Sequence, residues 1–261
     1  MTAHPSVSIV LPTYNERDNI GWMIEQLMKG FAAYELEILV VDDHSPDGTG
    51  ELVQTWSRTH PQVRLIVKDK KEGIGAALRV GYDAARGEIV ASMDADRSFL
   101  VADVVGLVQG VEQGEDLVLG CRHMAGAAYE AHTRSIRVKR WVSRTGNIVL
   151  RRGFGLPIHD FSANCRAIRR STWQRLHTTE KTNTLLMEMI LRCYAGGFRV
   201  GERPVSFLNR RYGASKLRLS IEAPKFLLRM LLYRWRFSRL ARPDPDGAQP
   251  AIRALSQSHP L

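Results

Sequence analysis

The sequence predicts an α/β fold in which helices cover both faces of an open sheet. Two observations carry this prediction. Short apolar, β-branched runs of the kind that form buried parallel strands recur at 7–11, 36–41, 63–67, 89–93 and 117–120. Segments with helical periodicity separate these runs, and this alternation is typical of a sheet with helices on both sides. Ligands of such sheets bind beyond the carboxyl ends of the strands.

The first predicted helix lies between the first two strands, at 16–31. One face of it carries apolar residues at helical spacing, and Asn15 is a candidate N-cap. These apolar residues are Ile20, Ile24, Leu27 and Phe31. The same reasoning predicts helices at 50–58, 75–86 and 102–112.

Gly73 and Gly75 lie at the start of the predicted helix at 75–86. They lack the third glycine of a dinucleotide-binding fingerprint, and they follow the third strand rather than the first. We therefore expect them to permit close packing at a helix N-terminus.

Beyond Arg122 the pattern changes. We expect a basic helix at 136–152, a strand or loop at 160–167, a helix at 184–195, a strand at 199–208 and a basic, apolar helix at 221–240. The predicted organisation is a catalytic domain at 1–217, a basic amphipathic helix at 218–242 and a disordered tail at 243–261.

The composition of the 261 residues excludes a mainly disordered or fibrous protein, because 44% are hydrophobic and 25% are charged. The three cysteines have no metal-ligand spacing, and their odd number argues against a secreted disulfide framework. The first residues lack a signal-peptide pattern, and no uncharged apolar run approaches the roughly 20 residues that span a bilayer. We therefore expect a reducing compartment and no membrane crossing.

The net charge of +10 is unevenly distributed. Residues 1–121 carry 10 Lys/Arg and 19 Asp/Glu, whereas residues 122–236 carry 24 and 6. Basic surface of this kind attracts nucleic acid, phosphorylated small molecules or an anionic lipid surface. No recognition-helix or RNA-binding pattern accompanies these cations, so phosphate capture is favoured over nucleic-acid binding.

An Asp-Ala-Asp turn follows the fourth strand directly. Asp94 and Asp96 are therefore placed where Mg²⁺ or Mn²⁺ can bind them together with a diphosphate. A solvated turn is the alternative for an isolated tripeptide, but the strand-end position favours a metal site. Asp43, after the second strand, is expected to accept hydrogen bonds from ribose hydroxyls or a base N–H, whereas a turn role is equally expected for Asp42.

Four segments of the sequence, in order, carry a resemblance to a known family. They are 10–16 (Val-Leu-Pro-Thr-Tyr-Asn-Glu), 40–49 (Val-Val-Asp-Asp-His-Ser-Pro-Asp-Gly-Thr), 87–96, and 209–216 (Asn-Arg-Arg-Tyr-Gly-Ala-Ser-Lys). The chain from about Val7 to Leu217 resembles family 2 glycosyltransferases, in particular their dolichol-phosphate mannosyltransferase or polyprenyl-phosphate branch. The resemblance implies a GT-A fold with a Rossmann-like mixed sheet, a nucleotide-sugar donor, a divalent metal at the Asp-Ala-Asp turn, and inversion at the anomeric carbon.

The resemblance also implies roles for individual residues. Those that would line the nucleotide pocket are Pro12, Tyr14, Glu16, Val41 and Asp43. Those that would hold the diphosphate through the metal are Asp94, Ala95 and Asp96, with Ser98 near a third metal-ligand position. The cations that would face phosphates of donor or acceptor are Arg122, Arg210 and Lys216.

The chain departs from the family pattern in three places. The family more often has Gly at the position of His44. The family usually continues the Asp-Ala-Asp turn with Leu, a polar residue and His-Pro, whereas Arg97, Phe99 and Leu100 stand here. Residues 160–164, Asp-Phe-Ser-Ala-Asn, replace the commoner Asp-x-Thr-Ser-Gly. An inactive scaffold of the same fold is therefore one alternative to an active enzyme.

The acceptor decides whether catalysis needs a base. A lipid phosphate is already anionic near pH 7, whereas a hydroxyl acceptor needs a general base within hydrogen-bond reach. Glu188, Asp160 and Asp96 are candidates for that base. Glu188 lies on an apolar helix face, and a packed or paired carboxylate is its alternative interpretation.

The leading hypothesis is metal-dependent, inverting transfer of a hexose, most simply mannose from GDP-mannose, to a polyprenyl phosphate at the cytoplasmic membrane face. Another donor such as a UDP-sugar, or a hydroxyl acceptor, is the alternative. Within 222–239, Lys225, Arg229 and Arg236 share one helical stripe, which fits an anionic membrane surface. Packing on the catalytic body or in a homodimer is the other interpretation, and a separate membrane protein is a further candidate partner.

Overall fold

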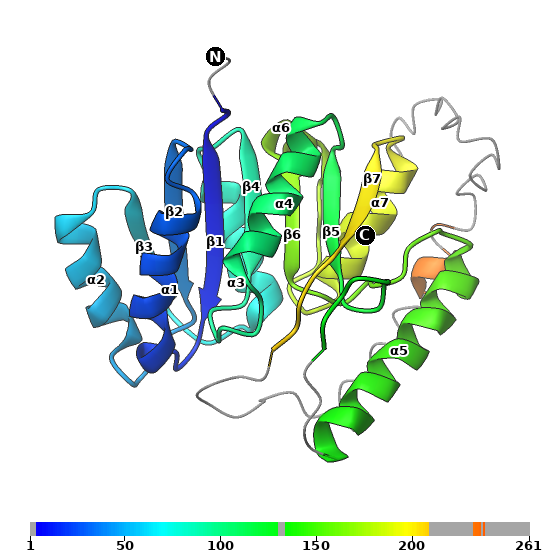
Figure 1. Ribbon diagram of the computed structural model, residues 1–261, viewed down its shortest axis with the longest axis horizontal. Helices are drawn as coiled ribbons and strands as arrows, with labels where there is room; N and C mark the ends of the chain where they lie inside the picture. Colours follow the sequence, from blue (N-terminus) through cyan, green and yellow to red (C-terminus); the bar gives the residue numbers. More distant parts are fainter. Residues whose placement is uncertain (1–3, 130–133, 209–231, 236, 238–261) are drawn as a thin grey trace.

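The computed structural model describes residues 4–129, 134–208, 232–235 and 237, and seven strands in this part of the chain form one sheet. Figure 1 shows the strands side by side in the order β3-β2-β1-β4-β6-β5-β7. They are β1 (Val7–Thr13), β2 (Leu36–Asp42), β3 (Val63–Val67), β4 (Ile89–Met93), β5 (Leu117–Cys121), β6 (Cys165–Arg169) and β7 (Val200–Pro204). β6 runs antiparallel to its neighbours β4 and β5, and the other pairs are parallel. The predicted mixed α/β sheet is confirmed.

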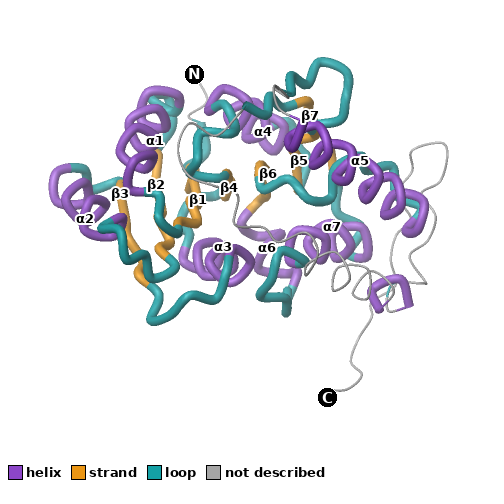
Figure 2. Tube along the Cα trace, turned by 90° about the horizontal axis from the view of Figure 1, so that it is seen from below, coloured by secondary structure: helices purple, strands orange, loops and turns teal. Residues whose placement is uncertain are grey.

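Helices cover both faces of this sheet. They are α1 (Arg17–Gly30), α2 (Thr49–Thr59), α3 (Ile74–Ala84), α4 (Val101–Glu112), α5 (Arg134–Phe154), α6 (Arg170–Leu176) and α7 (Leu185–Ala195). Figure 2 shows α1 and α4 on one face and α3, α6 and α7 on the other, whereas α5 lies to the side, beyond the β5–β7 end of the sheet. Each face has its own apolar core.

The predicted elements up to residue 121 are all present, with bounds shifted by at most about two residues, as is usual at element ends. α1 begins at Arg17 with Glu16 at the N-cap position rather than Asn15. Asn15 has φ 56°, a left-handed conformation that asparagine tolerates better than most residues, and it makes the turn that precedes the helix.

Two differences fall in the second half of the chain. The segment predicted as a strand or loop at 160–167 is a loop that leads into the antiparallel β6, and the predicted strand at 199–208 shortens to β7. α6 was not predicted, because its seven residues are too few for a periodic signal. The predicted helix at 218–242 and tail at 243–261 lie outside the described residues, apart from 232–235 and 237.

The carboxyl ends of the parallel strands meet at one edge. Thr13 pairs with Asp42 across β1 and β2, and the Asp43 N–H donates to the Thr13 carbonyl at 2.9 Å. β4 ends one residue before Asp94. Because β6 is antiparallel, its amino end lies at this same edge, and Cys165 pairs with Met93. The edge therefore combines the carboxyl ends of six parallel strands with the loop that precedes β6.

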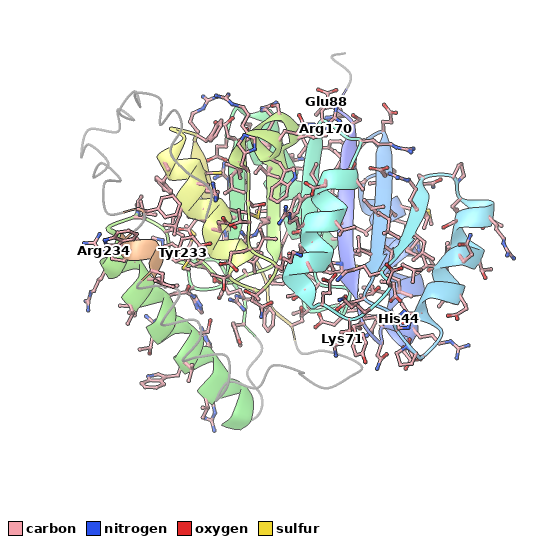
Figure 3. All side chains as sticks on the ribbon, turned by 180° about the vertical axis from the view of Figure 1, so that it is seen from behind. His44, Lys71, Glu88, Arg170, Tyr233 and Arg234 are labelled. Carbon is pink, nitrogen blue, oxygen red and sulfur yellow. The ribbon has the colours of Figure 1, made fainter. Side chains whose placement is uncertain are left out.

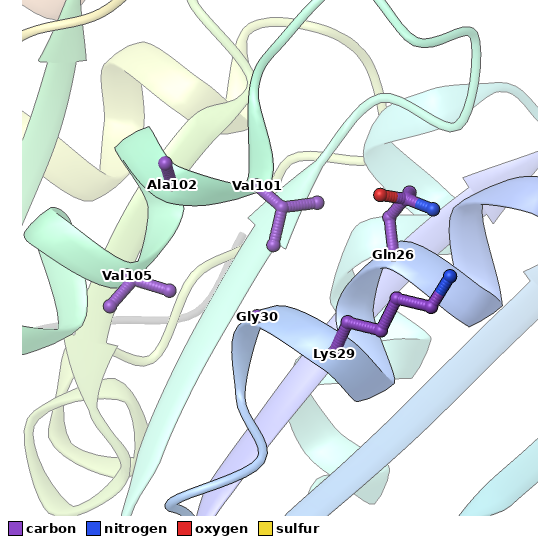
Figure 4. A pocket seen from close by; sticks show the side chains of 6 residues that line it. All are labelled: Gln26, Lys29, Gly30, Val101, Ala102 and Val105. Carbon is purple, nitrogen blue, oxygen red and sulfur yellow. The ribbon is translucent and has the colours of Figure 1, made fainter.

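An open groove lies elsewhere, between α1 and α4 (Figure 4). It is lined by Gln26, Lys29, Gly30, Val101, Ala102 and Val105. None of the strand-end residues contributes to it, and Lys29 is its one ionisable side chain. The groove therefore offers no chemistry comparable to that of the sheet edge.

Gly75 gives a test of the packing at the start of α3. A Cβ at this position would lie 2.0 Å from the Thr182 carbonyl oxygen, and this contact with backbone cannot relax by a side-chain rotation. We expect Gly75→Ala to lower the free energy of unfolding by about 2 kcal/mol or more. Urea denaturation of the purified chain measures it.

The matched control is Gly106→Ala in α4, where a Cβ meets nothing within 4 Å. This change should raise the free energy of unfolding by up to about 1 kcal/mol, because alanine is the better helix former. Equal effects of the two substitutions would contradict the packing at Gly75.

Candidate active site

Three turns at the carboxyl edge contain a non-glycine residue in the left-handed region. Asn15, His44 and Arg97 have φ values of 56°, 60° and 64°, and they follow β1, β2 and β4. Figure 3 shows His44 and Lys71 together at this edge, whereas Glu88 and Arg170 lie at the opposite one. Clustering of such conformations at one edge is typical of a functional site.

Asp42 and Asp43 are adjacent, but their carboxylates have different partners. Asp42 accepts hydrogen bonds from Thr13 Oγ1 at 2.9 Å and from Ser45 N and Oγ at 2.8 and 2.6 Å. These contacts are those of a turn.

Asp43 accepts hydrogen bonds from Lys68 Nζ at 2.7 Å and from the amides of Glu72 and Gly73 at 2.9 and 2.7 Å. Burial acts to raise the pKa of Asp43, but Lys68 and the two amides outweigh it, and the pKa is lowered. Asp43 thus ties the loop before α3 to the end of β2. Lys68 was not among the predicted site residues, although its position directly after the third strand indicated this edge.

The five residues predicted to line the nucleotide pocket all lie at this edge. Pro12 pairs with the fully buried Val41, and Glu16 accepts a hydrogen bond from Asn19 Nδ2 at 2.8 Å. Lys71 Nζ lies 3.5 Å from the centre of the Tyr14 ring. Their contact with a nucleotide stays a prediction.

The Asp-Ala-Asp turn lies where β4 meets the loop before β6. Asp94 Oδ1 accepts a hydrogen bond from Asn164 Nδ2 at 2.9 Å, and Asp96 Oδ1 accepts one from the Ser98 amide at 3.0 Å. Ala95 is 3% exposed, so the backbone between the two acids is packed. Ser98 Oγ is buried and has no hydrogen-bond partner among the described residues.

These three oxygen-bearing side chains fit a divalent cation. Mg²⁺ and Mn²⁺ prefer oxygen ligands, and Mg²⁺ is commonly held by one or two carboxylates together with substrate phosphates. The Ser98 hydroxyl, which has no hydrogen-bond partner among the described residues, is a neutral oxygen two positions after Asp96 in the sequence. The described part of the chain contains no cluster of three His, Cys, Asp or Glu suited to a metal.

Arg122 follows β5 and forms a bidentate ion pair with Asp160. Its Nε lies 2.7 Å from Asp160 Oδ2 and its Nη2 lies 3.0 Å from Oδ1, while Nη2 also donates to Ser162 Oγ at 2.8 Å. Asp160 is fully buried and accepts a further bond from Asn147 Nδ2 on α5 at 3.2 Å. The guanidinium is thereby fixed in one orientation at the edge of the sheet.

The pair shifts both groups toward their charged forms. Burial acts to raise the pKa of Asp160, but the charge and hydrogen bonds of Arg122 lower it far below the usual range. Burial acts to lower the pKa of Arg122, and the Asp160 carboxylate raises it instead. Asp160 therefore stays ionised and is bound to Arg122, which makes it a poor proton acceptor.

Glu188 has its own set of partners on α7. It is fully buried and accepts hydrogen bonds from the amides of Thr179 and Glu180 and from Arg192 Nε at 2.8 Å. These contacts fit a paired carboxylate that fixes the loop before α7. Its role as a general base stays a prediction.

The residues that depart from the family pattern pack against other elements. Arg97 Nη2 donates to the Asp18 carbonyl at 2.8 Å, and its guanidinium lies 4.6 Å from the centre of the Trp22 ring on α1. Phe99 is buried edge-to-face against Phe207.

Arg210 and Lys216 lie outside the described residues. Leu208, the last residue before this gap, donates its N–H to the Ser98 carbonyl at 2.8 Å. The described chain therefore contacts the residue two positions after Asp96 just before this gap.

Comparison with known proteins identifies similar sequences. A model of glycosyl transferase family 2 matches residues 8–176. The chain is 32% identical over 222 residues to a polyprenol monophosphomannose synthase of Mycolicibacterium smegmatis, with 80% of each chain covered. It is 31% identical over 217 residues to an undecaprenyl-phosphate mannosyltransferase of Micrococcus luteus, covering 81% of this chain and 87% of the relative. A dolichol-phosphate mannosyltransferase of Pyrococcus furiosus is 30% identical, with 81% of this chain and 59% of the relative covered.

Solved structures share the fold. Glucosyl-3-phosphoglycerate synthase from Mycobacterium tuberculosis, in complex with Mn²⁺, UDP and phosphoglyceric acid, has a TM-score of 0.64 at 20% identity, covering 93% of this chain and 81% of that one. A mannosyltransferase from Pyrobaculum calidifontis, in complex with GDP-Man and Mn²⁺, has a TM-score of 0.61 at 23% identity. The match covers 90% of this chain and 65% of that one. The predicted GT-A architecture is confirmed.

The buried Arg122–Asp160 pair gives a pH-dependent test. In the parent chain the pKa of Asp160 is lowered, so the stability it contributes is present above about pH 4 and is lost as the pH falls through that lowered pKa. Arg122→Met leaves a buried, unpaired carboxylate, whose pKa is then raised by burial. We expect the free energy of unfolding to fall by about 3 to 5 kcal/mol near pH 7. The difference from the parent should shrink toward pH 4, and chemical denaturation across this pH range measures it.

The double variant Arg122→Met/Asp160→Asn is the control. It removes both charges, and we expect it to regain most of the lost stability and to lose the pH dependence of the single variant. If Arg122→Met lowered the free energy of unfolding by the same amount at every pH, the pairing of Arg122 with Asp160 would be contradicted.

Proposed function

Because the chain belongs to glycosyl transferase family 2, we propose that it transfers mannose from GDP-mannose, with inversion at the anomeric carbon, to a polyprenyl phosphate. The observation that carries the proposal is the Asp94–Asp96 turn, with the unpartnered Ser98 hydroxyl beside it. The names of the three relatives support the choice of sugar and acceptor. One is a polyprenol monophosphomannose synthase, and the other two are mannosyltransferases named for undecaprenyl phosphate and dolichol phosphate. The solved structure that contains GDP-Man and Mn²⁺ supports the same donor.

Asp94, Asp96 and Ser98 are the residues that would hold a divalent metal, Mg²⁺ or Mn²⁺. Bound there with the donor, the ion would neutralise negative charge on the leaving diphosphate. The carboxylates of Asp94 and Asp96 would fix the position of that ion.

The proposed transfer forms one bond and breaks one. A phosphate oxygen of the lipid attacks the anomeric carbon of mannose, the bond from that carbon to the diphosphate oxygen breaks, and GDP leaves with the electron pair. The second pKa of a phosphate monoester is about 6, so the attacking oxygen is ionised at neutral pH and needs no base. The ion pair of Asp160 with Arg122 fits this mechanism, because it makes Asp160 a poor proton acceptor.

Arg122 is proposed to orient an incoming phosphate. Its Nε and Nη2 bind Asp160, which leaves Nη1 as the guanidinium nitrogen without a hydrogen bond to the described residues. We assign Arg210 and Lys216 to the phosphates as well, since Leu208, which precedes both in the sequence, donates its N–H to the Ser98 carbonyl.

The proposed membrane contact is supported by the outer side of α5. Apolar side chains are exposed along it at Val138 (54%), Trp141 (68%) and Ile148 (41%). The helix contains seven Lys/Arg and no acidic residue. An exposed apolar stripe within a wholly cationic helix fits an anionic membrane interface. None of the helices that the structure describes is long and apolar enough to cross a membrane.

A transfer assay tests the reaction. The purified chain is incubated with labelled GDP-mannose, a short polyprenyl phosphate and Mn²⁺, and the label is extracted into the lipid phase. We expect transfer by the parent and a loss of about 100-fold or more for Asp96→Asn, because the leaving diphosphate is no longer neutralised.

Two substrate controls separate the alternatives. Replacing the lipid phosphate by the free polyprenol should abolish transfer, because the alcohol is not ionised. Replacing GDP-mannose by a UDP-sugar should reduce it. Preferential use of the UDP-sugar, or of the free alcohol, would show that the proposed donor or acceptor is wrong.

Liposome flotation tests the membrane contact. We expect Val138→Ser/Trp141→Ser to weaken binding to anionic vesicles by about tenfold or more, because both side chains would lose apolar burial. Val67→Ser is the matched control, since it removes an equally exposed valine (53%) from β3 at the far end of the sheet. Equal binding of all three forms would reject α5 as the contact.

A further inference from the structure

A row of buried polar side chains runs behind the Asp94 turn. Tyr82 on α3 and Ser92 on β4 are 1% and 0% exposed, and Asn164 ahead of β6 is 4% exposed. The Tyr82 hydroxyl lies 2.8 Å from Ser92 Oγ, Ser92 Oγ donates to Asn164 Oδ1 at 2.7 Å, and Asn164 Nδ2 donates to Asp94 Oδ1 at 2.9 Å. The row therefore connects the core beneath the sheet to a carboxylate at its edge.

The chemistry of the four groups fixes the direction of every hydrogen bond in the row. An ionised Asp94 accepts only, so the NH₂ of Asn164 must face it and the amide oxygen must face Ser92. Ser92 then uses its one proton toward Asn164, and Tyr82 must donate to Ser92. Burial raises the pKa of Tyr82 to about 12, so the phenol keeps the proton that it donates.

The far end of the row is anchored in the core. The Tyr82 ring stacks on Trp173 with centroids 4.7 Å apart, and Trp173 Nε1 donates to Asp83 at 2.8 Å. A carboxylate on a turn can rotate about two side-chain bonds, whereas a buried amide with both of its ends bonded cannot. Partners of this kind commonly set the orientation of metal ligands, and their loss costs roughly 10- to 100-fold in metal affinity.

We propose that Asn164 is a positioning residue for the metal-binding turn: its amide, oriented by Ser92, holds the Asp94 carboxylate in the rotamer that binds the metal with the diphosphate. The inference rests on the proposed function, in which Asp94 is one of the residues that hold the metal. The amide occupies one lone pair of Oδ1 and carries no charge, so it orients the carboxylate without neutralising it.

The test measures metal binding rather than turnover. Mn²⁺ is titrated into the full chain in the presence of GDP, and free Mn²⁺ is followed by electron paramagnetic resonance. We expect Asn164→Ala to weaken Mn²⁺ binding by about tenfold or more and Ser92→Ala to weaken it by about threefold, the value of one neutral hydrogen bond.

Thr172→Val is the matched structural control. It removes a buried hydroxyl that bonds Asp116 at 3.4 Å, at the opposite edge of the sheet. We expect it to leave Mn²⁺ binding within about twofold of the parent, since a net loss of one remote hydrogen bond acts on stability alone. Urea denaturation identifies any variant that does not fold, and if Asn164→Ala is one of these, Ser92→Ala decides.

Asp96→Asn separates failure of this inference from failure of the proposed function. If Asp96→Asn loses Mn²⁺ while Asn164→Ala and Ser92→Ala bind like the parent, the positioning role is wrong and the metal site stands. If Asp96→Asn also binds Mn²⁺ like the parent, the metal site itself is wrong, and the inference fails with it.

Discussion

The site depends on the meeting of many carboxylates at one sheet edge, where each needs a partner that fixes its place. Parallel strands that end together bring acidic turns together, and burial of unpaired carboxylates is costly. Three carboxylates form ion pairs: Asp43 with Lys68, Asp160 with Arg122, and Glu188 with Arg192. Asp94 and Asp96 receive hydrogen bonds from neutral amides, which orient a carboxylate without cancelling its charge. Asp94 and Asp96 lie at the turn where the proposed function needs a cation.

The antiparallel strand β6 explains how the edge acquires residues from the second half of the chain. The amino end of an antiparallel strand lies beside the carboxyl ends of its neighbours, so the loop at 160–164 enters the site between β4 and β5. This loop supplies Asp160 to Arg122 and Asn164 to Asp94. A parallel strand in the same place would have put these two residues at the opposite edge, with Glu88 and Arg170.

This topology also marks how far the sequence could predict the site. The apolar runs and the acids that follow them were enough to predict the sheet, the helices before residue 121 and the strand-end position of Asp43, Asp94 and Asp96. The sequence pointed to Arg122 and Asp160 separately but not to their pairing, because that contact spans 38 residues and depends on the direction of β6. The Asn164 side chain was visible only as a departure from the family's glycine, since its two hydrogen bonds join segments about 70 residues apart.

The basic half of the chain is joined to this edge through α5. On its inner side Asn147 donates to Asp160 at 3.2 Å and accepts from the Phe161 amide at 2.9 Å, and Leu150 and Phe154 pack into the core. Its outer side exposes Trp141 and arginines. Under the proposed function, the lipid tail stays in the bilayer while its phosphate reaches the sheet edge, so the membrane contact and the phosphate site must keep a fixed separation. α5 meets that requirement, because its outer side carries the proposed membrane contact and its inner side binds Asp160 at the phosphate site.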